Sequence, residues 1–89
     1  MNAIIAVIGQ DKVGILSSIS AVCAEYNANV VDVTQTVMQK YFAMIMLVQI
    51  DELGCDFGEF CANVQDVGKD IGMTVHVMHE DIFNSMHRV

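Results

Sequence analysis

The spacing of apolar and polar residues changes character several times along the chain. Residues 3–8 form a short, largely β-branched run that stops at Gly9, which predicts a buried strand. Apolar residues then recur every three or four positions, which predicts an amphipathic helix over residues 13–26 that ends at the Asn27 turn. Residues 30–38 alternate as in a strand, with Val31, Val33, Gln35 and Val37 assigned to one face.

The second half of the chain repeats this succession of elements. Gln39-Lys40 predicts a hairpin turn, and residues 41–50 predict a strand that is apolar on both faces. Helical spacing from 57 to 71 follows, with Asp56 placed to cap the start and Gly72 to close the end. Residues 73–80 predict a final strand, and 81–86 a short helix capped by Asp81.

The predicted order is βαββαβ, which indicates an α+β fold of the ferredoxin-like kind. It packs as a four-stranded antiparallel sheet with two helices on one face. We expect one domain over residues 1–89, with 81–89 as a C-terminal extension. An exposed edge strand that pairs with its symmetry mate is one route to a two-fold dimer. Two helices cover only one face, but apolar residues occur on alternating sides of the strands, so we expect a second subunit to cover part of the other face. These residues are Ile4, Ile8, Ile45, Leu47 and Met78.

Charge and cysteine content narrow the classes of partner. A net charge of −7 repels a phosphate backbone, which argues against direct nucleic-acid contact. The apolar runs are shorter than the ~20 residues of a membrane span, and the first residues lack the basic region of a secretory signal. Three cysteines without a C-x-x-C pair argue against a disulfide framework. We therefore expect a cytoplasmic protein that does not bind membranes.

The segment Gly9-Gln10-Asp11-Lys12-Val13-Gly14-Ile15-Leu16 links the first strand to the first helix. Free N–H groups at a helix start, together with the helix dipole, favour a carboxylate or another anion. Asp11 is placed either to cap the helix or to receive a ligand ammonium group, and Gly14 allows a close approach. Capping alone, without any ligand, accounts for these residues equally well.

This segment, the Asn-Ala-Asn-Val-Val-Asp segment at 27–32 and the βαββαβ order together resemble the ACT domain family, with only the family's usual loop proline replaced, by Val13. The resemblance covers essentially the whole chain and is closest to free-standing ACT proteins of bacteria and archaea. It implies a regulatory domain that binds an amino acid or another small effector between two subunits. The implied binding residues are Gly9, Gln10, Asp11, Lys12 and Gly14, faced by Asn29 and Val30 of the partner.

The resemblance implies a homodimeric sensor that modulates a partner protein, with no cofactor and no catalytic residues. The alternative is a structural dimerisation or interaction module that binds no small molecule. A third possibility, an enzyme that uses Cys55 or a histidine metal site, has the least support. His76 and His79 point to opposite faces of a strand, so we expect no metal site from them and His87. Cys23 and Cys61 are interpreted as core residues.

Overall fold

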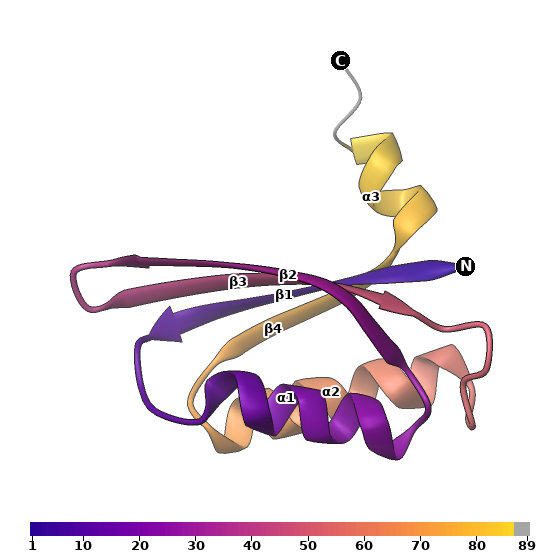
Figure 1. The fold of residues 1–89 in the computed structure, drawn as a ribbon, viewed down its shortest axis with the longest axis horizontal. Coiled ribbons are helices and arrows are strands. Elements are labelled where there is room, and N and C mark those ends of the chain that lie inside the picture. Colours follow the sequence, from indigo (N-terminus) through magenta and orange to yellow (C-terminus); the bar gives the residue numbers. More distant parts are fainter. Residues whose placement is uncertain (87–89) are drawn as a thin grey trace.

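Four antiparallel strands form one sheet, and a pair of helices covers one of its faces in the computed structural model (Figure 1). The structure describes residues 1–86. The elements in chain order are β1 (Asn2–Gln10), α1 (Ile15–Glu25), β2 (Asn29–Met38), β3 (Tyr41–Gln49), α2 (Phe57–Asp70), β4 (Thr74–His79) and α3 (Glu80–Met86). The strands lie in the order β2-β3-β1-β4. The predicted ferredoxin-like architecture is confirmed, and α3 stands on the face opposite α1 and α2.

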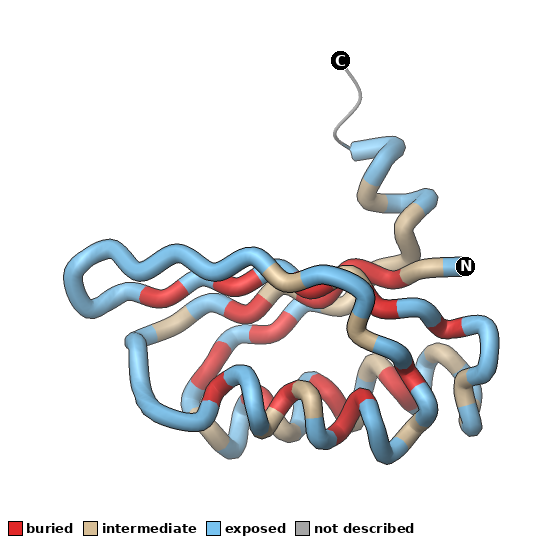
Figure 2. The backbone as a smooth tube through the Cα atoms, viewed as in Figure 1, coloured by how far each residue is buried: buried red, intermediate tan, exposed pale blue. Residues whose placement is uncertain are grey.

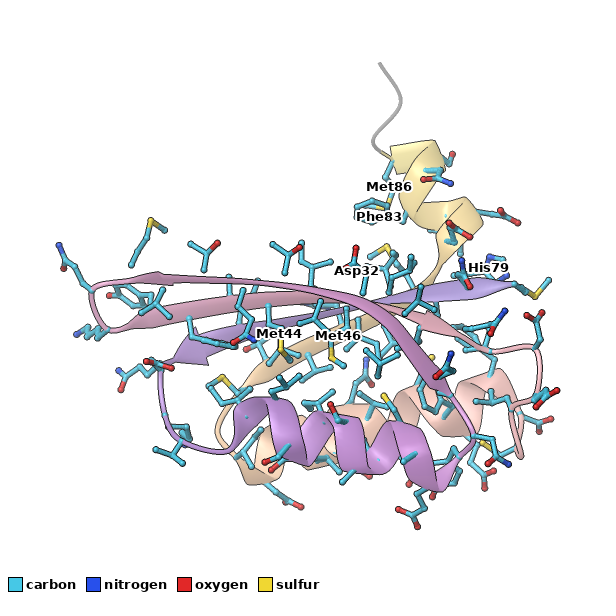
Figure 3. The ribbon with its side chains drawn as sticks, viewed as in Figure 1. Asp32, Met44, Met46, His79, Phe83 and Met86 are labelled. Atoms are coloured by element: carbon cyan, nitrogen blue, oxygen red, sulfur yellow. The ribbon has the colours of Figure 1, made fainter. Side chains whose placement is uncertain are left out.

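The core lies between the sheet and the helix pair (Figure 2). Strict alternation along β1 and β3 sends every second side chain into it, as expected for strands with one face packed on helices. Met44 and Met46 of β3 are almost fully buried there (Figure 3), so they fill the core. The buried side chains from the helices include Ile19 and Cys23 of α1 and Phe60 of α2.

Left-handed residues end the helices where the sequence indicates. Asn27 follows α1 with a φ of 63°, and Gly72 follows α2 with a φ of 73°. Gln39 has a φ of 57° in the hairpin turn between β2 and β3. Asn and Gly adopt this conformation at low cost, which explains why Asn27 and Gly72 could be predicted as helix ends.

The start of β2 departs from simple alternation. The pairing of β2 with β3 shifts between Val30 and Asp32, so Val31 is the extra residue of a β-bulge. Val33 pairs with the core-facing Met46, whereas Val31 has no place in that register and is more than half exposed. The prediction that Val31 shares the face of Val33 was therefore wrong, because the bulge interrupts the alternation.

Two of the predicted helix caps also need correction. Asp56 occupies the N-cap position of α2, but its side chain makes no cap hydrogen bond within residues 1–86. α3 begins at Glu80, so Asp81 lies inside the helix instead of capping it. The Asp81 N–H donates to His79 Nδ1 at 3.1 Å, which turns the chain directly from β4 into α3.

Candidate functional site

The loop from Gly9 to Gly14 is held between the hairpin turn and the start of α1. The Asp11 N–H donates to the Lys40 carbonyl at 2.8 Å, which ties the loop to the β2–β3 turn. Gly14 is the N-cap residue of α1, with a φ of 89°, and Ser17 Oγ donates to its carbonyl at 3.2 Å. Asp11 therefore does not cap α1, since the backbone places Gly14 at that position.

This arrangement leaves the N-terminal turn of α1 available to an anion. No side chain caps α1 among the described residues, and its first turn holds no acidic residue. The N–H groups of that turn and the positive end of the helix dipole together favour a carboxylate. Asp11 and Lys12 are both exposed, so each can reach a molecule bound at the loop.

Asn29 and Val30 lie at the far end of the sheet from this loop. Gln10 pairs with Tyr41 at one end of β3, and Asn29 pairs with Gln49 at the other. At ~3.4 Å per residue the two ends of β3 are about 27 Å apart. One chain therefore does not bring the two predicted halves of the site together.

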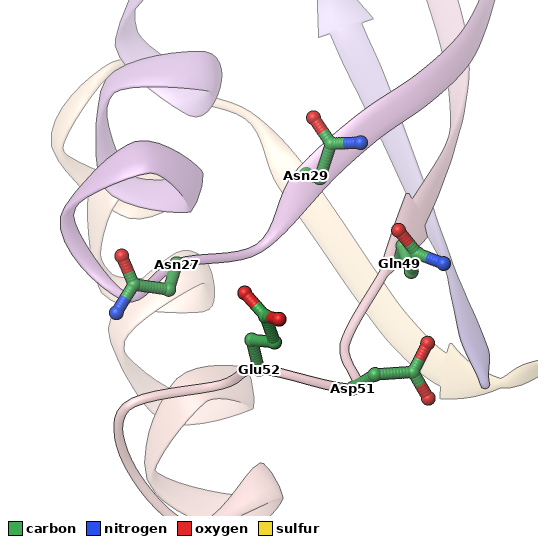
Figure 4. Close-up of a pocket in the computed structure, with 5 residues that line it drawn as sticks. All are labelled: Asn27, Asn29, Gln49, Asp51 and Glu52. Atoms are coloured by element: carbon green, nitrogen blue, oxygen red, sulfur yellow. The ribbon is translucent and has the colours of Figure 1, made fainter.

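A polar hollow of about 330 Å³ lies beside Asn29 (Figure 4). Its lining residues come from the α1–β2 turn, the start of β2, the end of β3 and the loop that follows: Asn27, Asn29, Gln49, Asp51 and Glu52. The Glu52 side chain rises from the loop between the other chain segments. Hollows of this volume accommodate small ligands.

A second, more open hollow of about 370 Å³ adjoins the first and is lined partly by Val30 and Ser20. The predicted binding residues Asn29 and Val30 therefore lie at a concave part of the surface. The sequence analysis missed Gln49 and Glu52, because polar residues at a strand end or in an acidic turn usually just face solvent. Only their convergence on Asn29 in space distinguishes them.

Two carboxylates, those of Asp51 and Glu52, line the first hollow. Asp51 accepts a hydrogen bond from the Met1 ammonium group at 2.7 Å, which offsets one carboxylate. Glu52 is exposed and forms no ion pair within residues 1–86, so a ligand ammonium group is the complementary chemistry.

The cysteines carry protonated thiols at neutral pH. Burial raises the pKa of Cys23 to about 11 and also raises the pKa of Cys61. Desolvation and the nearby Glu59 raise the pKa of Cys55. A nucleophilic cysteine needs a lowered pKa, so this environment argues against Cys55 as a nucleophile. Cys23 is fully buried as predicted, whereas Cys61 is only partly buried.

The histidines do not converge in the described part of the chain. His76 is exposed. His79 Nδ1 lies 3.6 Å from a carboxylate oxygen of Asp81, and the His79 ring packs edge-on against the Phe57 ring, with the two centroids 6.3 Å apart. Residues 1–86 hold no group of three potential metal ligands, and His87 lies outside them. None of the helices formed by these residues is both apolar and long enough to span a bilayer.

Comparison with known proteins places this geometry in a family. The model of the ACT domain matches residues 2–78. The chain belongs to the ACT domain family. ACT domains are typically regulatory domains that bind small molecules.

Relatives of similar length support the assignment. The chain is 48% identical to a UPF0237 protein of Methanocaldococcus jannaschii over 99% of this chain and 98% of the relative. It is 42% identical to a UPF0237 protein of Listeria monocytogenes over the full length of both. An ACT domain protein from Streptococcus pneumoniae superposes with a TM-score of 0.82, at 34% identity and covering 98% of both chains.

Proposed function

We propose that this ACT domain is a homodimeric sensor that binds an amino acid between two copies and thereby changes its interaction with a partner protein. One observation carries the proposal: the anion-favouring loop and the Asn29 hollow lie at opposite ends of the same sheet. A two-fold axis converts two such distant halves into two complete sites.

The edge position of β2 supplies the geometry for that axis. Edge strands present unpaired N–H and C=O groups that a symmetry mate can pair with. Antiparallel pairing of two β2 strands sets the Asn29 end of one copy beside the Met38 end of the other. Met38 pairs with Tyr41, which pairs with Gln10, so the Gly9–Gly14 loop lies at that same end. The loop of one copy then faces Asn29 and Val30 of its partner.

The two halves offer complementary groups for a zwitterion. The open first turn of α1 suits an α-carboxylate. Asp11 from the same loop suits the α-ammonium group, Glu52 from the partner's hollow adds negative charge beside it, and the Asn29 amide both donates and accepts. Because the site is shared, effector binding favours the dimer and alters the surface presented to a third protein.

A second candidate is a dimerisation module without an effector. It is favoured by the sheet face opposite α1 and α2, where Ile8 and Ile45 are about half exposed. On this account the loop serves only to start α1. The protein would then keep its oligomeric state and melt at the same temperature with every amino acid.

Thermal melting against the twenty amino acids separates the two candidates. A ligand at ~100 times its dissociation constant adds ~2.7 kcal/mol to the unfolding free energy, which raises the midpoint by well over 5 °C for a domain of this size. We expect one amino acid to produce this shift, and expect Asp11→Ala and Asn29→Ala each to remove it. Asp66→Ala, an exposed change on α2, is the control that retains it. A panel without any shift would contradict the sensor proposal.

A further inference from the structure

The sheet face that α1 and α2 leave bare, here called the open face, is ordered in rows across the four strands. The register places Met78, Ile4, Leu47 and Asp32 in one row, His76, Ala6, Ile45 and Thr34 in the next, then Thr74, Ile8, Ala43 and Thr36. Ile4 is 8% exposed beside α3 yet lies outside the core cluster, whereas Ile8 is 52% exposed. The apolar surface is thus covered at the α3 end and bare toward the hairpin.

The open face is nearly free of charge, although the molecule as a whole is acidic. Of the eleven acidic residues in the sequence, the described rows contain only Asp32. That carboxylate accepts a hydrogen bond from the Val33 N–H at 2.9 Å, within its own bulge. A partner with a basic surface would gain little here. A second copy of the same acidic chain meets little repulsion over these rows, because Glu80 and Asp81, in the first turn of α3, add negative charge only at one end of the face.

α3 stands up from one end of this face (Figure 1). It follows His79, which pairs with Ala3 near the start of β1, and it contacts β1 and β4. Phe83 and Met86 lie on the side of α3 that overhangs the sheet (Figure 3). Seven residues of helix rise about 10 Å, which equals the ~10 Å spacing of two sheets packed face to face. α3 therefore reaches the level of a second sheet laid on the open face.

We propose that the open face packs against the open face of a second copy, with the two-fold axis running across the strands. A two-fold axis parallel to the strands would place the α3 helices of both copies at the same end of the interface. An axis across the strands reverses one sheet, so each α3 closes the end where the other copy is bare. Ile45, near the middle of the face, then packs close to the axis.

The available area suits this contact. Four strands ~4.8 Å apart and ~30 Å long present roughly 550 Å² per copy, or about 1,100 Å² for the pair before α3 is counted. Stable interfaces begin near ~1,000 Å² in total. This contact is separate from the β2 edge of the proposed function. If both form and the two perpendicular axes intersect, four copies close into one assembly.

Light scattering after gel filtration of the full chain tests the contact. Ile45→Glu places two carboxylates near the axis while Ile45 is already 47% exposed, so the fold tolerates the change. Ile8→Glu repeats the test on another strand. Ala62→Glu adds the same charge on an exposed position of α2, on the other side of the molecule, and is the matched control. Circular dichroism of each variant checks that it is folded.

We expect both sheet variants to have half the mass of the wild type at equal concentration, and the control to keep the wild-type mass. A wild type that is a monomer would assign the face to a different partner and overturn the proposal. Sheet variants with the wild-type mass would overturn it as well. Because this contact is independent of the β2 edge, the halving is expected whether or not an amino acid binds, and any effector-induced melting shift should persist in Ile45→Glu.

Discussion

Gly68 is the point where α2 comes closest to the sheet. A Cβ built on Gly68 would overlap Val75 Cγ2 and would lie 3.1 Å from Val75 Cβ and 3.5 Å from the Met73 carbonyl oxygen. In an exposed helix, Gly→Ala stabilises a protein by up to ~1 kcal/mol. Here the methyl group has no space, because Gly68 and Val75 are both buried and Val75 is branched at the atom that it meets.

The balance of these two effects gives the magnitude. Overpacking a close-packed core costs typically ~1–3 kcal/mol, which exceeds the helix-propensity gain. We therefore expect Gly68→Ala to lower the unfolding free energy by about 1–2 kcal/mol, equivalent to roughly 4–12 °C in the melting midpoint. Val75→Ala in the same chain removes the overlapping methyl groups, so the double variant should be less destabilised than the sum of the single changes.

Urea unfolding followed by circular dichroism measures these differences. Gly58→Ala is the internal control, because it lies in the same helix and a Cβ there meets nothing within 4 Å. The control should be neutral or stabilising by up to ~1 kcal/mol. If Gly68→Ala proved as stable as Gly58→Ala, the close approach of α2 to β4 would be refuted.

Three further predictions test the loop and the core. Gly14→Ala should cost about 1–2 kcal/mol through its φ of 89° alone, since its Cβ would meet only Ser17 Oγ at 3.8 Å, and Gly14→Asn should cost less in the same urea titration. Gly9→Ala should cost less than Gly68→Ala, because the atom it displaces is the flexible Met73 sulfur, and paired melting curves compare the two. Cys23, with a pKa raised from 9.0 to about 11, stabilises the fold fully below pH 9 and progressively loses that contribution as the pH rises through 11. The lost contribution is on the order of 2–3 kcal/mol, seen as a steeper alkaline loss of stability than in Cys23→Ala.

The fold could be predicted from the sequence because the apolar spacing changed at the same positions as the turn-forming residues. Alternation along β1 and β3 identified the core-facing residues such as Ile5 and Met46, and Asn27 and Gly72 marked helix ends. The bulge at Val31 was not predicted, because an inserted residue leaves no local pattern in an otherwise alternating sequence. The side-chain caps were mispredicted for two reasons: Asp56 takes the N-cap position of α2 without a cap hydrogen bond from its side chain, and in α1 Gly14 takes that position in place of Asp11.

Only half of the candidate site could be predicted from the sequence, because its two parts differ in how they are assembled. The Gly9–Gly14 loop is contiguous, so its role at the start of α1 follows from a strand–loop–helix pattern. The hollow at Asn29 is built from two segments about twenty residues apart in the chain, and Gln49 and Glu52 join it only through the pairing of β2 with β3. A site shared between copies adds a symmetry axis, which a single sequence does not encode locally.

A mixing experiment tests the shared amino-acid site most directly. Isothermal titration would measure effector binding to Asp11→Ala, to Asn29→Ala and to an equimolar mixture of the two after subunit exchange. Each variant alone should fail to bind. In the mixture, each heterodimer regains one intact site, so about a quarter of the wild-type number of sites should bind with the wild-type dissociation constant. A mixture that binds no more effector than its two components would contradict a site formed by the loop of one copy and Asn29 of its partner.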